Sequence, residues 1–157
     1  MKTKEIVHDE LLDRLNRTVI DAAAYFASAD ESLFDGRHTA HGVLAQLVFW
    51  HEQYVSVAGA LLQGRTPTLK GGSFERLNQI ARSNFAGDSM TMLAYDLSCL
   101  QKEFDAILRQ LPDWSVNFPI KNDSEECSLG ERLFEIEQHI RQHVQRLKRS
   151  QTVTSSV

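Results

Sequence analysis

Two histidines stand four residues apart near the C-terminus, in the stretch IEQHIRQHVQRL of residues 136–147. Because four residues make about one helical turn, His139 and His143 can share a helix face and offer two imidazole nitrogens to one metal ion. Zinc proteases use the same spacing, but their motif needs a glutamate directly after the first histidine, and Ile140 occupies that position. The pair is therefore either an unassigned two-histidine metal platform or two hydrogen-bonded core histidines.

Two imidazoles rarely fix an ion by themselves, so a metal site needs a third ligand. The stretch HTAHGVLAQLVFWHEQY, residues 38–54, offers candidates for it. At about 100° per residue, His51 falls toward the inward face of a helix, Gln46 at the edge of that face and His41 toward solvent. His51 and Gln46 are the two candidates for the third position.

Aromatic residues could form a pocket wall above the histidines. Trp50, Tyr54 and Trp114 are candidates for a hydrophobic pocket, although such residues also serve as ordinary core. Glu135 and Glu137 flank the first histidine of the pair, and we expect them on a charged helix exterior.

The elements that must position these residues follow from apolar spacing of three and four, which predicts amphipathic helices. Thr39, Ser89 and Ser128 are predicted N-caps, and Ser128 begins an S-x-x-E capping box. The expected helices span residues 5–29, 40–61, 74–84, 90–111 and 129–149. This pattern predicts an all-α, up-down four-helix bundle with a short extra helix between helices two and three. Residues 1–149 form one domain, and 150–157 are an expected disordered tail.

Composition limits the classes of function. The 157 residues, 42% of them hydrophobic, suffice for one core, and a net charge of −4 without a dense basic block argues against a nucleic-acid partner. The N-terminal stretch lacks the continuous apolar run of a signal peptide or membrane span, so we expect no membrane partner and a cytoplasmic location. The two cysteines have no CxxC spacing, which argues against a disulfide framework or a zinc-thiolate site.

Three stretches together resemble the DinB/YfiT-like four-helix-bundle superfamily, and in particular its ClbS/DfsB-like branch. They are TAHGVLAQLVFWHE (39–52), the segment 74–108 with its Leu77-Asn78 pair, and SLGERLFEIEQHIRQH (128–143). The resemblance covers nearly the whole chain, and its motifs are degenerate.

The resemblance implies a divalent ion, nickel, zinc or manganese, held by one histidine of helix two and two of the last helix. His139 and His143 match the last-helix positions, whereas Gln46 falls where the family has its helix-two histidine. An amide oxygen is a poorer ligand for these ions than imidazole. Either the site is degenerate and weak, or His51 substitutes, or the metal has been lost.

The activity that the resemblance implies is that of a metal-dependent hydrolase or thiol transferase acting on a small electrophilic molecule. An ion with open coordination positions would activate a water molecule or the thiol of an unidentified cofactor. The alternative is a metal-free small-molecule-binding or stress-response module of the same fold. The resemblance also implies a homodimer as an expected assembly.

Overall fold

The computed structural model describes the backbone of residues 2–155 and the side chains of residues 8–151. Its regular elements are the helices α1 (Lys2–Ser28), α2 (Ala40–Leu62), α3 (Phe74–Asn84), α4 (Met90–Leu108) and α5 (Leu129–Ser155). No strand is present in the described residues. The predicted all-helical class is confirmed.

Four helices begin at a hydroxyl side chain that accepts a hydrogen bond from an amide of the first turn, which would otherwise lack a partner. The pairs are Thr39 with Gly42 (3.1 Å), Ser73 with Arg76 (3.1 Å), Ser89 with Met92 (3.1 Å) and Ser128 with Glu131 (3.2 Å). The predicted caps at residues 39, 89 and 128 are therefore confirmed.

The helix ends differ more from the expectation than the helix starts. α4 ends at Leu108, three residues earlier than expected, and the chain continues in a turn. α5 continues to Ser155, so the backbone of residues 150–155 is helical where a disordered tail was expected. Residues 156 and 157 of that tail lie outside the described residues.

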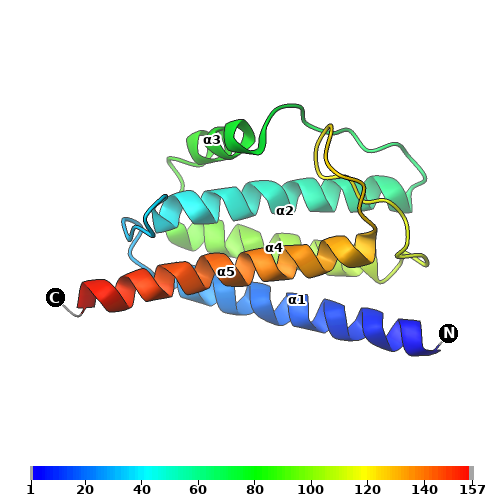
Figure 1. Cartoon of the computed structure of the whole chain (residues 1–157), viewed down its shortest axis with the longest axis horizontal. Coiled ribbons are helices and arrows are strands. Elements are labelled where there is room, and N and C mark those ends of the chain that lie inside the picture. Colours follow the sequence, from blue (N-terminus) through cyan, green and yellow to red (C-terminus); the bar gives the residue numbers. More distant parts are fainter. Residues whose placement is uncertain (1, 156–157) are drawn as a thin grey trace.

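The helix directions correct the expected up-down alternation. Figure 1 shows α2 and α4 running the same way, with α1 and α5 running opposite to them. Contacts agree, since His51 meets Gln101 and, further along both helices, Tyr54 meets Phe104. The physical reason is the long connection containing α3, which returns along the molecule so that α4 starts beside the start of α2.

The core lies between the four long helices, whose apolar stripes meet there. Its largest fully buried side chains include Phe26, Leu44, Leu97, Phe104 and Leu133. α3 covers one side of α2 and buries Leu77 and Ala81. Burial of such side chains stabilises the fold by about 1.5 to 3 kcal/mol each.

The loop between α4 and α5 is fixed by its aromatic residues. Phe118 is fully buried with its ring 6.3 Å from that of Phe104, and its carbonyl accepts a hydrogen bond from Arg132 Nε at 3.2 Å. Trp114 Nε1 donates to the carbonyl of Leu108 at 3.4 Å. The loop therefore holds the start of α5 in place.

None of the helices, over their described residues, is both long enough and apolar enough to cross a membrane.

Replacing Phe118 by alanine should lower the free energy of unfolding by about 3 kcal/mol or more, because a fully buried ring leaves a cavity. Phe134→Ala is the matched control, since Phe134 is 45% exposed and its loss should change stability by about 0.5 kcal/mol at most. Urea unfolding of both variants measures the difference. Equal effects would show that the loop does not depend on Phe118.

Candidate functional site

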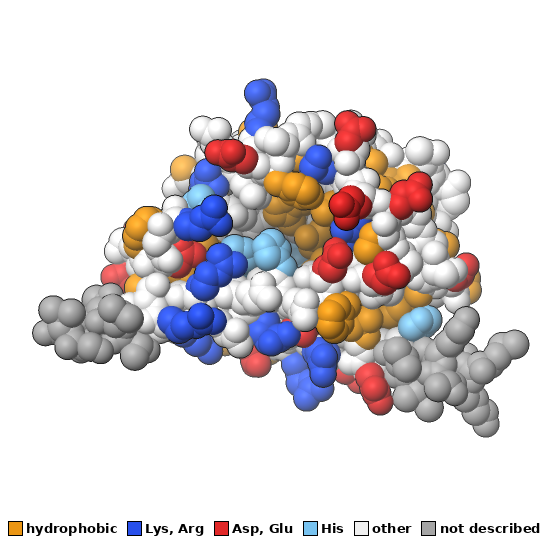
Figure 2. Space-filling view, viewed as in Figure 1, with side chains coloured by type: hydrophobic (Ala, Val, Ile, Leu, Met, Phe, Trp, Pro, Cys, Tyr) orange, Lys and Arg blue, Asp and Glu red, His pale blue; other side chains and the backbone are white. Residues whose placement is uncertain are grey.

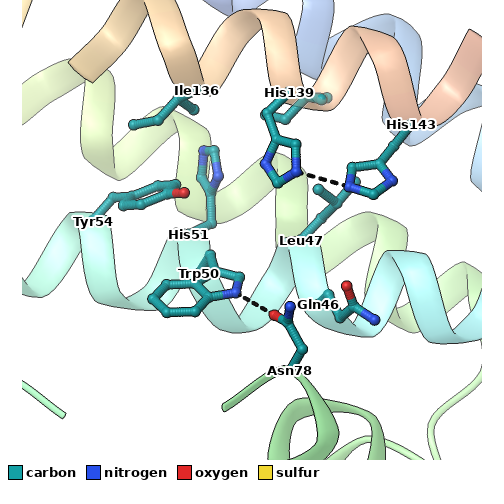
Figure 3. A pocket seen from close by; sticks show the side chains of 10 residues that line it. Gln46, Leu47, Trp50, His51, Tyr54, Asn78, Ile136, His139 and His143 are labelled. Atoms are coloured by element: carbon teal, nitrogen blue, oxygen red, sulfur yellow. Dashed lines mark hydrogen bonds between the residues drawn. The ribbon is translucent and has the colours of Figure 1, made fainter. Parts of the chain in front are cut away.

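A narrow pocket lies between α2, α3 and α5 (Figure 3). Its lining consists of Gln46, Leu47, Trp50, His51, Tyr54, Asn78, Ile136, His139, Ile140 and His143. The volume of the pocket that is open to a water molecule is only ≈ 20 Å³. That is room for about one water molecule or one ion. In this conformation the pocket takes a small occupant and no whole substrate.

The two histidines of α5 contact one another across one helical turn. His139 Nε2 and His143 Nε2 are 3.0 Å apart, and Figure 3 shows both rings projecting from α5 toward α2. A hydrogen bond between two imidazole nitrogens needs one donor and one acceptor, so the pair holds only if at least one ring is neutral.

Burial and a neighbouring positive charge lower the pKa values of both rings of the pair. Burial lowers the pKa of His143 to about 4, and the charges of His139 and Arg146 act in the same direction. His139 is more exposed than His143, but the partial burial of its ring, followed by the charge of Arg146, lowers its pKa as well. Neutral imidazole is the form that binds metal ions. In the hydrogen-bonded pair one Nε2 carries the proton, so binding one ion through both Nε2 atoms requires that proton to move to Nδ1 of its ring.

Two polar atoms at this site are buried without a hydrogen-bond partner: His143 Nδ1 and Gln46 Nε2. Their side chains are only 9% and 6% exposed. A buried polar group left unpaired costs about 1 to 3 kcal/mol. Figure 3 shows Gln46 on the α2 side of the pocket, with its amide oxygen turned toward the α5 histidines and its nitrogen turned away from them. Both atoms therefore have hydrogen-bonding capacity left for a water molecule or a ligand.

His51 is tied to the opposite side of the bundle by a chain of side-chain hydrogen bonds. His51 Nε2 lies 2.7 Å from Gln101 Oε1, and Gln101 Nε2 lies 2.7 Å from Asn16 Oδ1. Asn16 Nδ2 then donates to Asp105 Oδ1 at 2.9 Å, and Asp105 Oδ2 accepts from Arg109 Nε at 3.0 Å. The chain crosses from α2 through α4 and α1 to the surface.

The Asp105 carboxylate sets the direction of this whole chain. A carboxylate paired with Arg109 can only accept, so Asn16 must present its amide nitrogen to Asp105 and its oxygen to Gln101. Gln101 therefore presents its oxygen to His51, whose Nε2 must carry the proton. Nδ1 of His51 is left with its lone pair, and burial lowers the pKa of this ring to about 4.

Two of the three predicted pocket aromatics line this pocket. Trp50 Nε1 donates to Asn78 Oδ1 at 2.6 Å, which ties α3 to α2 beside the histidines. Tyr54 contacts the His51 ring with centroids 5.5 Å apart. The third, Trp114, lies elsewhere and stacks on His8 at 4.1 Å.

The donor set fits an ion only in part. Among the described residues, no group of three or more His, Cys, Asp or Glu side chains is placed to hold a metal, so His51 does not complete a three-histidine site. The 3.0 Å between the Nε2 atoms nevertheless suits two ligands of one ion. At metal–nitrogen distances of about 2.0 to 2.1 Å, ligand nitrogens lie about 2.9 Å apart at a right angle and about 3.3 Å apart in a tetrahedron. Gln46 supplies the third donor, an amide, in the same pocket.

The residues that the sequence analysis missed are the polar partners of His51. Gln101 is only 3% exposed and stands between Leu97 and Phe104 at helical spacing. A glutamine within an apolar stripe is a signal that could have marked it as a buried hydrogen-bonding residue. Glu137 is a second miss, because it is buried and not on the exterior, where its carboxylate pairs with Arg141 at 3.1 Å.

No family model matches the chain, and no curated protein matches it. Two solved structures are similar in fold. An uncharacterised protein from Escherichia coli UTI89 is 14% identical, with 94% of each chain covered and a TM-score of 0.72. An uncharacterised protein from Clostridium difficile 630 is 18% identical, with 90% of this chain and 95% of that chain covered and a TM-score of 0.66. At these identities the likeness shows the fold alone.

The low pKa of His51 predicts acid sensitivity. Its ordinary value is 6.5, so the unfolded chain takes up a proton between pH 6.5 and about 4 that the folded protein does not. The stability contribution is full above pH 6.5 and is lost as the pH falls toward 4, by about 3 kcal/mol for this ring. Urea unfolding against pH, with NMR titration of the imidazole signals, measures both. A His51 ring that titrates near 6.5 would contradict the prediction.

Asp105→Asn should release the fixed tautomer of His51, because an amide can both donate and accept and no longer sets the direction of the chain. The ¹⁵N chemical shifts of the two ring nitrogens should then move toward values for mixed tautomers. Asp13→Asn is the control, since its carboxylate lies 3.6 Å from Arg109 but outside the chain. Unchanged His51 shifts in Asp105→Asn would contradict this assignment.

Proposed function

We propose that His139, His143 and Gln46 hold one divalent transition-metal ion, and that the protein is a metal-dependent hydrolase or transferase acting on a small electrophilic molecule. The observation that carries the proposal is the histidine pair with its Nε2 atoms 3.0 Å apart, beside the buried side chain of Gln46, in a pocket with room for one small occupant. Nickel and zinc both suit imidazole ligands.

A bound divalent ion would supply Lewis acidity, which makes a nucleophile of water or of a thiol near neutral pH. Two imidazoles and one amide leave coordination positions open, which is the arrangement of a catalytic rather than a structural site. Because an amide is a weaker ligand than imidazole, we expect modest affinity.

The other residues of the pocket would serve the reaction by position. The Trp50–Asn78 hydrogen bond holds α3 against α2 beside the histidines. The Nδ1 lone pair of His51 is available to accept a hydrogen bond, and no described residue donates to it. A substrate would place only its reactive group in the pocket and keep the rest of its surface at the mouth.

The resemblance to the DinB/YfiT-like superfamily supports the same proposal. The fold has four long helices, a short helix between the second and third of them, and the histidine pair on the last. Membership of that superfamily, a cytoplasmic location and a homodimeric assembly are parts of this proposal.

A second candidate function is metal-free binding of a small molecule. It is favoured by one observation: the His139–His143 hydrogen bond is complete without an ion. In that case, the unpartnered atoms of Gln46 and His143 would bind the ligand directly.

Titration of the chelator-treated protein with Ni²⁺ or Zn²⁺ separates the two functions. The protein should bind about one ion, and His143→Ala should abolish binding because only one imidazole remains. Gln46→His should tighten binding about tenfold or more, since an imidazole replaces an amide. Turnover of a chromogenic electrophile, with and without an added thiol, should require the ion.

His8→Ala is the control for this titration, because His8 stacks on Trp114 away from the pocket. It should bind metal as the parent does. Equal metal uptake by the parent and His143→Ala would overturn the site assignment. No uptake by the parent, together with ligand-dependent thermal stabilisation, would establish the metal-free function instead.

A further inference from the structure

Two arginines near the histidine pair make no close contact with a carboxylate among the residues that the structure describes. Arg82 lies near the end of α3, and Arg146 lies one turn beyond His143 on α5. Both side chains are half-buried, and neither makes a hydrogen bond or ion pair with any described residue. By contrast, Arg109 and Arg132 each pair with a carboxylate at 3.0 Å. Half-buried guanidinium groups without partners are suited to bind an anion.

Arg82 is held across the first turn of α2. A Cβ atom built on Gly42 would lie 3.1 Å from Arg82 Cδ and 3.3 Å from Thr39 Oγ1. The glycine therefore makes room for the arginine side chain. The first turn of α2 contains no acidic residue, and the positive end of its helix dipole adds to the charge of Arg82. Gln46 lies one turn further along the same helix.

Arg146 lies on α5, three residues after His143, and its charge acts on the histidine pair. Its positive charge contributes to the lowered pKa values of His139 and His143, after burial as the main cause. Arg82 likewise contributes to the lowered pKa of His38, again after burial. The two arginines and the histidines therefore share one electrostatic neighbourhood.

One carboxylate belongs to this neighbourhood, that of Asp35. Its Oδ1 accepts hydrogen bonds from the backbone amides of Arg37 and His38, at 2.8 and 2.9 Å. It forms no ion pair within 4.0 Å of either guanidinium. Against the opposing effect of burial, its pKa is lowered by these two backbone hydrogen bonds and, after them, by the charges of His38 and Arg146. Figure 2 shows Lys and Arg side chains gathered on the side of the histidines toward the C-terminus of α5, and acidic side chains on the other side. The side of the pocket toward the C-terminus of α5 is thus locally positive, on a chain of net charge −4.

The unpartnered atom of Gln46 would bind the same kind of group as the two arginines. Gln46 Nε2 is a hydrogen-bond donor without an acceptor, on a side chain only 6% exposed. The two guanidinium groups are also donors, and the pocket itself is too narrow to hold more than a small group. These donors therefore lack a negatively charged hydrogen-bond acceptor.

We propose that this end of the pocket binds an oxyanion of the ligand, a carboxylate or phosphate group, between Arg82 and Arg146, with Gln46 Nε2 donating to it. The inference rests on the proposed function, because it names the ligand class of the same site. The electrophilic part of such a ligand would extend from the anion toward His139 and His143.

The test uses the full chain without metal, so that its result does not depend on metal binding. Inorganic phosphate is titrated into chelator-treated protein at neutral pH and constant ionic strength, and the imidazole NMR signals of His139 and His143 are followed. Acetate is titrated in a parallel series. Saturable shifts with either anion support the inference, and the tighter of the two identifies a phosphate or a carboxylate ligand.

Variants make the result specific. Arg146→Gln and Arg82→Gln should each weaken anion binding about tenfold, the loss of a charged hydrogen bond. Arg146→Lys keeps the charge and should retain most of the affinity. Arg65→Gln is the matched control, since it removes the same charge beyond the far end of α2, where Arg65 Nε donates to Gln63. Thermal melts confirm that each variant is folded.

Two outcomes would overturn the inference. One is the absence of saturable shifts with both anions. The other is equal affinity in the parent, Arg82→Gln and Arg146→Gln, which would mean an adventitious ion only. Metal uptake without anion binding would leave the proposed function standing, and anion binding without metal uptake would remove the metal but leave this site.

Discussion

Burial of imidazole rings among apolar helices is the constraint on which this site depends. His51 is 1% exposed and His143 is 9% exposed, so a charged ring at either position would lose its hydration. The bundle keeps these two rings neutral and gives each of them one hydrogen-bond partner: Gln101 for His51, and His139 for His143. Two buried atoms, His143 Nδ1 and Gln46 Nε2, have no hydrogen-bond partner among the described residues, and a ligand would bind there.

The hydrogen-bond chain behind His51 explains why a polar residue can lie so deep in the bundle. Each of its amides uses both its donor and its acceptor, and the chain ends at a carboxylate paired with a surface arginine. A fully satisfied network of this kind rigidifies a core, whereas a partly satisfied one destabilises it. The chain also leaves one nitrogen of His51 with a defined role, that of an acceptor.

Local features could be predicted from the sequence, and non-local ones could not. The caps at Thr39, Ser89 and Ser128, the apolar stripes and the facing histidine pair follow from spacing alone, and the structure confirms them. The parallel course of α2 and α4 depends on how the connection through α3 returns, which no helical periodicity encodes. The partnership of His51 with Gln101 depends on that course, as does the placement of Trp114 away from the pocket. Glu137 was assigned to the exterior because charge normally indicates exposure, but its carboxylate is buried with Thr18 and Arg141 as partners.

The metal content of the purified, tag-free protein tests the central claim most directly. Elemental analysis should find close to one divalent ion per chain, and a chelator should lower the melting temperature as the ion is removed, because a ligand that binds only the folded state stabilises it. Absence of metal, with a melting temperature that neither chelator nor added Ni²⁺, Zn²⁺ or Mn²⁺ changes, would contradict the account and leave His139 and His143 as a hydrogen-bonded pair of a metal-free pocket.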